Sequence, residues 1–258
     1  MSASTLDSMT MTDPGRHAAA VKALPPDVAA IVRTVQGLLI HEGWAGSYGV
    51  ELDDPPTVHL RRAEQLLDAA GDRPLSEARE PGDRVPTMCR SFTVLTVAML
   101  RAHGFDARSR AGFGAYFTPG RYDDHWVVEV GGRLVDAQID AVQAEALKLD
   151  FDPLDVPRDK FLPGPDAWRL VRAGRADPEL FGHPPANMAG EWFVAGNVIR
   201  DRADVEVLPW DSWDPMPGPG EAVDRDLIDR IAAGDEAVKV PGEVFNERRG
   251  RMEPLVSP

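Results

Sequence analysis

The sequence has very little cysteine: Cys89 is the only one among 258 residues. A single thiol cannot form a disulfide within the chain, and it cannot supply a zinc site built from several cysteines. The question that the composition leaves is whether Cys89 is a small buried side chain, as lone cysteines usually are, or a reactive one.

The sequence also lacks a hydrophobic run that could cross a membrane. Its longest apolar stretch, Phe92 to Leu100, is about half of the ~20 residues that a spanning helix needs, and it contains two threonines. The first twenty residues have neither the basic start nor the apolar run of a secretion signal. We therefore expect a cytoplasmic protein without a membrane partner.

Positive charge is scarce, with 28 Lys and Arg against 42 Asp and Glu, for a net charge of −14. Such a chain repels a phosphate backbone, which argues against a nucleic-acid partner. The excess is strongest from Asp201 to Glu236, where 11 acids face 3 bases, and we interpret this segment as an acidic surface layer. The sequence has no P-loop, no H-E-x-x-H and no calcium-binding loop, so we expect neither a cofactor nor a metal.

Hydrophobic residues make up 43% of the chain and charged residues 27%, which is typical of soluble globular proteins. A chain of this length is expected to form one large domain, or one core with appendages. We predict a disordered lead-in over 1–24, a core over 25–140, and a helical and irregular extension over 141–258 that packs on the core. Frequent prolines mark the extension.

Hydrophobic periodicity and turn residues predict an α+β fold. The helix predicted from Met88 to Gly104 is apolar on nearly all sides, as in a helix buried at the centre of a domain. Gly131-Gly132 is typical of a tight hairpin between the last two strands of the core. The other predicted helices are Pro25 to Gly43, Thr57 to Ala70, Asp166 to Arg175 and Met188 to Arg200, and the predicted strands are Ala107 to Phe113, His125 to Val130 and Arg133 to Ala137.

Cys89 stands at the start of the predicted buried helix. Unpaired backbone N–H groups and the positive end of the helix dipole stabilise a thiolate there, which makes the sulfur a nucleophile. His125 begins the second of the three strands predicted after this helix. Asp136 lies on the third, which is the hairpin partner of the second. Neighbouring antiparallel strands let a carboxylate orient an imidazole whose other nitrogen faces the thiol. Considered alone, His125 would be interpreted as a surface histidine and Asp136 as a solvated residue at the end of a strand.

Together these residues form part of a longer pattern. The stretches CRSFTVLTVAMLRAHGFDARSRAGF and HWVVEVGGRLVDAQID, within Thr87 to Asp140, resemble the bacterial branch of the transglutaminase-like superfamily of papain-fold cysteine enzymes. The resemblance implies a papain-like core in which Cys89, His125 and Asp136 form a catalytic triad. The chain departs from the usual family pattern at four positions, Thr87, Ser91, Trp126 and Ala137. We therefore expect a divergent member whose substrate need not be a protein glutamine.

The resemblance implies acyl transfer or hydrolysis through a thioester on Cys89, with His125 as the base and Asp136 as its orienting group. In this superfamily one oxyanion donor is typically the cysteine N–H and another is a side chain upstream; Trp44 is our first candidate and Gln36 the second. The expected substrate is a small molecule, a peptide or a carrier-bound acyl compound.

Three alternatives stay open at this stage. Transfer to an amine is favoured slightly because the tryptophan-bearing extension could cover the cleft and exclude water. A cytoplasmic cysteine peptidase or amidase would use the same triad with water as the acceptor. A binding protein with a vestigial triad is the third alternative, and the sequence does not specify an oligomeric state.

Overall fold

The computed structural model describes residues 11–203 and 205–255, which form two compact units. The N-terminal unit consists of 11–109 and 127–156, and the C-terminal unit consists of 110–126 and 157–255. The division differs from the predicted boundary at residue 140 because the long strands β3 and β4 each begin in one unit and end in the other. Each unit is described below by itself.

The N-terminal unit is mainly helical, with short strands. Its strand pairs include the parallel pair β1–β2 and the antiparallel hairpin β4–β5, in which Val128 faces Val135. In chain order the elements are η1 (Gly15–His17), α2 (Ala18–Lys22), α3 (Val28–Leu38), β1 (Leu39–His41), η2 (Glu42–Tyr48), η3 (Pro56–His59), α4 (Ala63–Ala69), η4 (Pro81–Asp83), β2 (Val85–Thr87), α5 (Cys89–Ala102), the start of β3 (Ala107–Gly114), the end of β4 (Tyr122–Val130), β5 (Arg133–Val135), α6 (Ala141–Leu147) and η5 (Pro153–Asp155).

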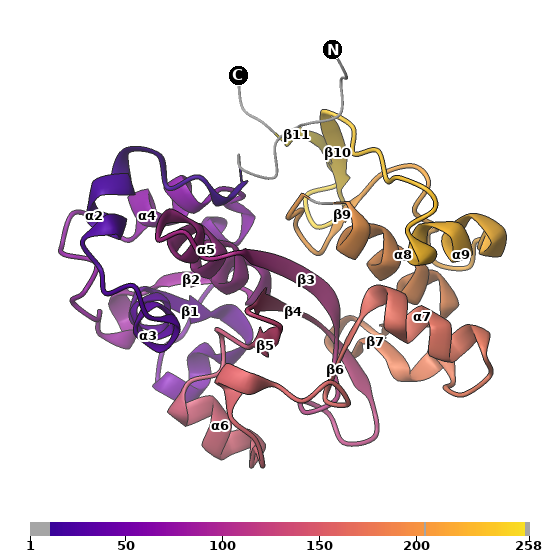
Figure 1. The fold of residues 1–258 in the computed structure, drawn as a ribbon, viewed down its shortest axis with the longest axis horizontal. Helices are drawn as coiled ribbons and strands as arrows, with labels where there is room; N and C mark the ends of the chain where they lie inside the picture. The colour runs from indigo at the N-terminus through magenta and orange to yellow at the C-terminus, as the bar shows by residue number, and fades with distance from the viewer. Residues whose placement is uncertain (1–10, 204, 256–258) are drawn as a thin grey trace. The chain divides into compact units, whose positions relative to one another are not determined.

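Helix α5 is the centre of this unit, and it confirms the predicted buried helix. Every residue from Cys89 to Leu100 is buried, and both α3 and α4 pack against α5 (Figure 1). A helix that is apolar on all sides must be enclosed in this way. One largely aliphatic core joins Phe92 and Leu95 of α5 to Val128 and Val135 of the hairpin. The predicted hairpin turn is also confirmed, since Gly131 and Gly132 both have positive φ.

The predicted disordered lead-in is wrong for residues 11–24, whereas 1–10 lie outside the described residues. Residues 15–22 form η1 and α2, and the side chains of Met11, Val21 and Leu24 are buried. An ion pair from Arg16 and a hydrogen bond from His17, both to Asp68 of α4, add to this packing. The segment lacks helical periodicity, but a few well-placed apolar side chains are enough to dock it.

Two predicted helix boundaries are also corrected. The first helix ends at Leu38 rather than Gly43, because the next three residues pair with β2 as strand β1. The second splits into η3 and α4, and α4 begins at Ala63 because the Gln65 side chain accepts the backbone N–H groups just before it.

The described part of the C-terminal unit combines two sheets with the helices α7, α8 and α9. The sheet order is β6-β3-β4-β7-β8, in which β4 and β7 are parallel, and β9, β10 and β11 form a second sheet. Helix α8 packs against α7 and α9 (Figure 1). Besides its parts of β3 and β4, the elements are β6 (Phe161–Pro163), α7 (Gly164–Arg172), η6 (Pro178–Leu180), β7 (Phe181–His183), η7 (Pro184–Ala186), β8 (Met188–Ala189), α8 (Glu191–Arg202), β9 (Asp211–Ser212), α9 (Arg225–Ala233), β10 (Glu243–Asn246) and β11 (Arg251–Pro254).

Aromatic rings fill the interior of this unit. Phe113 packs edge-on against Phe181 with ring centroids 5.1 Å apart, and Tyr122 stacks on the same Phe181 ring at 4.4 Å. The strands approach closely: a Cβ added at Gly182 would lie 1.9 Å from the Met188 carbonyl oxygen. Such spacing requires glycine at this position.

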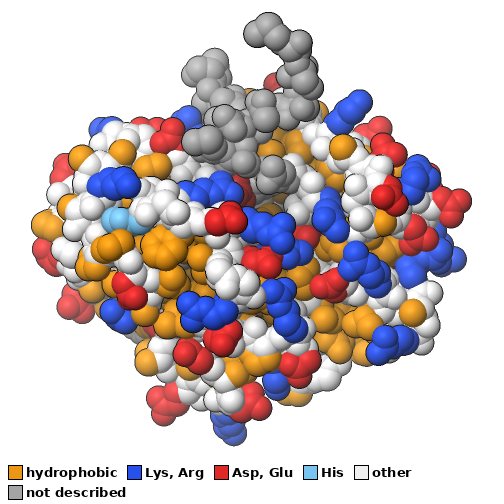
Figure 2. All heavy atoms as spheres, viewed as in Figure 1, with side chains coloured by type: hydrophobic (Ala, Val, Ile, Leu, Met, Phe, Trp, Pro, Cys, Tyr) orange, Lys and Arg blue, Asp and Glu red, His pale blue; other side chains and the backbone are white. Residues whose placement is uncertain are grey.

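The predicted acidic layer is interleaved with arginine side chains. Arg172 pairs with Asp229, and Arg225 pairs with Glu191. Figure 2 shows basic side chains set among acidic ones on the face that it draws. Among residues 11–203 and 205–255, no helix is long and apolar enough to cross a membrane.

Candidate active site

Cys89 is the first residue of α5 and directly follows the Met88 N-cap. Its side chain is buried, with 7% exposure, and is a free thiol. Met88 provides no side-chain cap, and the first turn of α5 holds no acidic residue. The first N–H groups of a helix have no partner within it, so the positive end of α5 lies uncapped beside the sulfur.

Buried hydroxyl groups lie on both sides of Cys89 in the sequence. Thr87 and Ser91 are fully buried, and neither hydroxyl oxygen has a hydrogen-bond partner within the described part of the chain. These are two of the positions at which the sequence departs from the family pattern. Because buried polar atoms are nearly always paired, two unpaired hydroxyls so close to Cys89 in the sequence are an unusual feature of this helix start.

Asp136 follows β5 and is completely buried, so the alternative of a solvated strand end is wrong. Its Oδ1 accepts the backbone N–H of Gln138 at 3.0 Å, and its own N–H donates to the Pro153 carbonyl at 2.7 Å. A carboxylate bonded to the backbone two residues on forms an Asx turn, which fixes its orientation.

His125 lies on β4 within the C-terminal unit and is only 2% exposed, so the alternative of a surface histidine is wrong. Three aromatic rings meet its imidazole at steep angles, those of Phe117 at 4.7 Å, Tyr116 at 6.1 Å and Phe161 at 6.4 Å between centroids. Aromatic side chains therefore surround much of the ring.

The structure places Cys89 and Asp136 in the N-terminal unit and His125 in the C-terminal unit. The aliphatic core around α5 includes Val135 and Ala137, the two neighbours of Asp136. One core thus supports both the helix that begins with Cys89 and the segment that carries Asp136. The triad of all three residues stays a prediction.

The two oxyanion candidates have different surroundings. Trp44 lies on η2 and is partly buried, and its role as a donor stays a prediction. The Gln36 amide nitrogen on α3 donates to the carbonyls of Ala137 at 3.3 Å and Ile139 at 3.0 Å. Its two hydrogens are thereby used by the backbone next to Asp136, so Gln36 supports that segment rather than offering a free donor.

Two carboxyl groups precede His125 on β4. Burial raises the pKa of Asp123, and Thr118 and Arg121 oppose that shift. Burial also raises the pKa of Asp124, against the charges of Arg200, His183 and His125 and the hydrogen bond that Asn197 donates at 3.0 Å. Asp124 is therefore electrostatically linked to His125. Among the described residues, no group of three or more His, Cys, Asp or Glu side chains is arranged to hold a metal ion.

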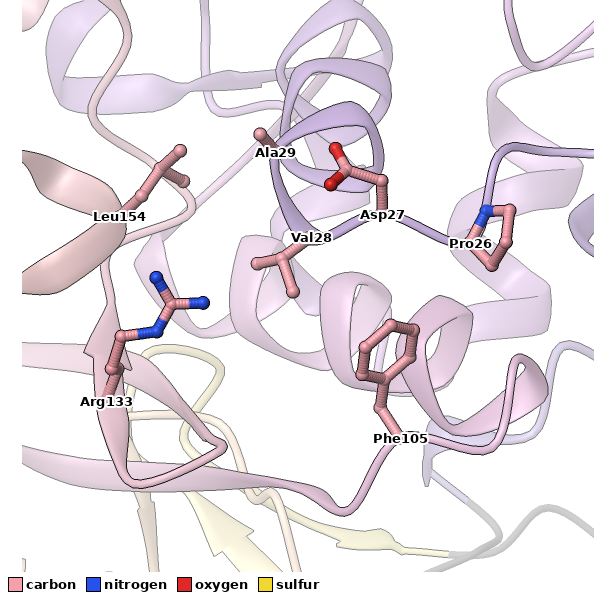
Figure 3. Close-up of a pocket in the computed structure, with 7 residues that line it drawn as sticks. All are labelled: Pro26, Asp27, Val28, Ala29, Phe105, Arg133 and Leu154. Atoms are coloured by element: carbon pink, nitrogen blue, oxygen red, sulfur yellow. The ribbon is translucent and has the colours of Figure 1, made fainter.

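Two hollows of the N-terminal unit lie at opposite ends of α5. One, of about 370 Å³, lies where Phe105 follows the end of α5, with the side chains of Arg133 and Leu154 on its other side (Figure 3). The other lies near the start of α5 and is too narrow to hold a water molecule. It is lined mainly by polar side chains, among them Gln36, Tyr48, Gln138 and Gln143, and by Phe92, which lies one turn after Cys89.

No protein family matches the chain, and neither do the curated proteins or the solved structures compared with it. The function is accordingly inferred from the residues of the site. Sequence reasoning missed Tyr48, Gln138 and Gln143, which meet only through the fold: Tyr48 and Gln143 are 95 positions apart.

Proposed function

We propose that the chain is a transglutaminase-like enzyme with a papain-like core, which forms a thioester acyl-enzyme on Cys89. The observation that carries the proposal is the position of Cys89 as the first residue of a buried helix with no side-chain cap. Its support comes from the order of elements, in which β4 bears His125 and Asp136 directly follows β5.

The chemistry is a two-step acyl transfer. His125 takes the thiol proton, and the sulfur attacks the acyl carbon of an amide, ester or thioester. The leaving group departs with a proton from His125, which leaves the acyl group on Cys89. Water or an amine then attacks the thioester, His125 accepts a proton from it, and the thiol is restored. Asp136 holds the imidazole in the tautomer that this sequence requires.

The burial of Cys89 favours a slender acyl substrate. A sulfur in a side chain that is 7% exposed is accessible to a small molecule, a peptide end or a carrier-bound chain more readily than to the surface of a folded protein. Because water and amines enter at the same step, a transferase and a peptidase or amidase would share these residues.

The test is the reaction of Cys89, the only thiol, with iodoacetamide at a series of pH values, followed by mass spectrometry. We expect Cys89 to react faster than the thiol of a short unstructured peptide at the same pH, because the proposed site activates it as a nucleophile. Incubation with an activated acetyl ester should then place one acetyl group on Cys89, and amines should compete with water to release it. If the alkylation rate depends on pH as it does for an ordinary thiol, and no acetyl group is attached, the proposal is overturned in favour of a binding protein.

A further inference from the structure

We propose that Gln36, Gln138, Gln143 and Tyr48 form a network that positions the Asp136 carboxylate for catalysis. This inference rests on the proposed function, in which Asp136 orients His125. The four are positioning residues, because they act through Asp136 rather than on a substrate.

Gln138 connects the carboxylate to the rest of the network. Its backbone N–H donates to Asp136 Oδ1 at 3.0 Å, and its side-chain nitrogen donates to Gln143 Oε1 at 2.9 Å. Gln138 and Gln143 are 3% and 2% exposed, so these bonds are shielded from water. A bond in such an environment is stronger than in water, and its loss leaves buried polar groups unpaired.

Gln143 and Tyr48 anchor the far end of this chain of bonds. The Gln143 side-chain nitrogen donates to the Tyr48 hydroxyl at 3.1 Å, and Asp140 Oδ1 accepts the Gln143 backbone N–H at 3.1 Å. Burial and, less strongly, Asp140 raise the pKa of Tyr48 to about 12, while Gln143 opposes the shift. The hydroxyl therefore stays neutral across the pH range in which a thiol titrates, and the network does not change charge with it.

Gln36 holds the same segment from the other side. Its side chain donates to the carbonyls of Ala137 and Ile139, which flank Gln138. Because α3 packs against α5, this contact ties the Asp136 segment to the helix that begins with Cys89. Residues 137–139 are thus held by two glutamine side chains from different parts of the chain.

Precise placement of a catalytic group is what such a network would supply. A misplacement of about 1 Å can cost roughly a hundredfold in rate. Buried amide side chains are costly to keep in a core, and the Gln138 side-chain oxygen has no hydrogen-bond partner within the described residues, so an apolar core would be the simpler way to stabilise this region. Their convergence on residues 136–139 points to positioning rather than packing.

The test compares the pH midpoint of Cys89 alkylation by iodoacetamide in the full chain and its variants. Asp136→Asn should raise the midpoint by about one pH unit or more, because it removes the charge that stabilises the imidazolium partner of the thiolate. Gln36→Leu and Gln143→Leu should raise it by part of that amount. Tyr48→Phe, a milder change that keeps the ring, should produce a smaller shift in the same direction.

Gln65→Leu is the matched control. Gln65 lies in the same unit and accepts two backbone N–H groups at the start of α4, away from Asp136. It should lower the melting temperature without moving the alkylation midpoint.

The outcomes separate the two proposals. A wild-type midpoint at the ordinary ~8.5 would reject the proposed function, and positioning with it. A low wild-type midpoint that Asp136→Asn raises, but that folded Gln36→Leu, Gln143→Leu and Tyr48→Phe leave unchanged, would reject positioning alone. If the leucine variants fail to fold, Tyr48→Phe decides: a shift supports positioning and an unchanged midpoint rejects it.

Discussion

The two units differ in what fills their interiors. The N-terminal unit encloses α5 in aliphatic side chains and holds the Asp136 segment with neutral amide groups. The C-terminal unit packs aromatic rings and buries charged groups, including the Arg110–Asp201 pair and Asp124 beside Arg200.

The residues of the proposed site differ in how their surroundings respond to pH. Cys89 and Asp136 lie in an interior that also buries Arg79 and Arg90, and because guanidinium groups are not deprotonated in proteins, the geometry of this interior should change little with pH. His125 lies in an interior with charged neighbours, so changes of pH alter its surroundings. We expect the pH dependence of stability to arise mainly in the C-terminal unit, and catalytic geometry to depend on both units.

The largest expected effect is that of Cys89→Ala. Turnover and acetyl labelling should fall at least about a thousandfold, because no other thiol can carry the acyl group. Urea unfolding should show little change, since alanine suits the first turn of a buried helix. Retained labelling in this variant would show that Cys89 is not the nucleophile.

A second prediction compares the units on a single strand. On β3, Arg110 forms two 2.8 Å bonds with Asp201, whose side chain is 2% exposed, whereas Arg108 pairs with Glu129 while 60% exposed itself. Arg110→Leu should reduce the free energy of unfolding by about 3–5 kcal/mol, because it strands a buried carboxylate. Arg108→Leu should cost about 1 kcal/mol or less.

Urea titrations of both variants provide the measurement, and each arginine serves as the control for the other. Equal losses would show that burial does not distinguish the two pairs, and the contrast between the two interiors would then fail for charged groups.

Local sequence signals predicted the centre of the fold correctly. The buried helix, the three strands that follow it and the Gly131-Gly132 turn each depend on residues close together in the chain. Cys89 could be placed at a helix start for the same reason. Periodicity and turn chemistry carry this kind of information.

Features that depend on distant contacts could not be predicted in this way. Residues near the end of the first predicted helix form strand β1 instead, because they pair with β2, more than forty positions away. Gln36 bonds to Ala137 across 101 positions, so nothing near Gln36 indicates that its amide is already used. The docking of η1 and α2 packs Val21 into the core around α5 and pairs Arg16 with Asp68, and the lead-in itself contains neither partner.

A smaller effect should appear in the pH dependence of the C-terminal unit. Burial raises the pKa of Asp123, so the stability that its protonated form provides is present below the unfolded value of ~3.9 and is lost as pH rises through the folded pKa. Asp123→Asn should therefore raise the melting temperature at pH 7, by less than about 4 °C, and leave it unchanged at pH 3. The exposed Asp106→Asn controls for the loss of one charge, and a rise of equal size at both pH values would contradict the pKa explanation.

The smallest expected effect concerns the docked segment of the N-terminal unit. His17 first, and Arg16 second, lower the pKa of Asp68, so the stability from these contacts is present above the unfolded value of ~3.9 and is lost as pH falls through the folded pKa. Because Asp68 is 42% exposed, Asp68→Asn should cost about 0.5 kcal/mol or less at pH 7. Hydrogen exchange provides a sharper measurement, since the amides of Ala18–Lys22 should exchange severalfold faster in the variant while those of α5 stay unchanged. If the amides of Ala18–Lys22 exchange in the wild-type chain as fast as those of an unfolded peptide, the segment is not docked. The aliphatic interior would then begin at α3.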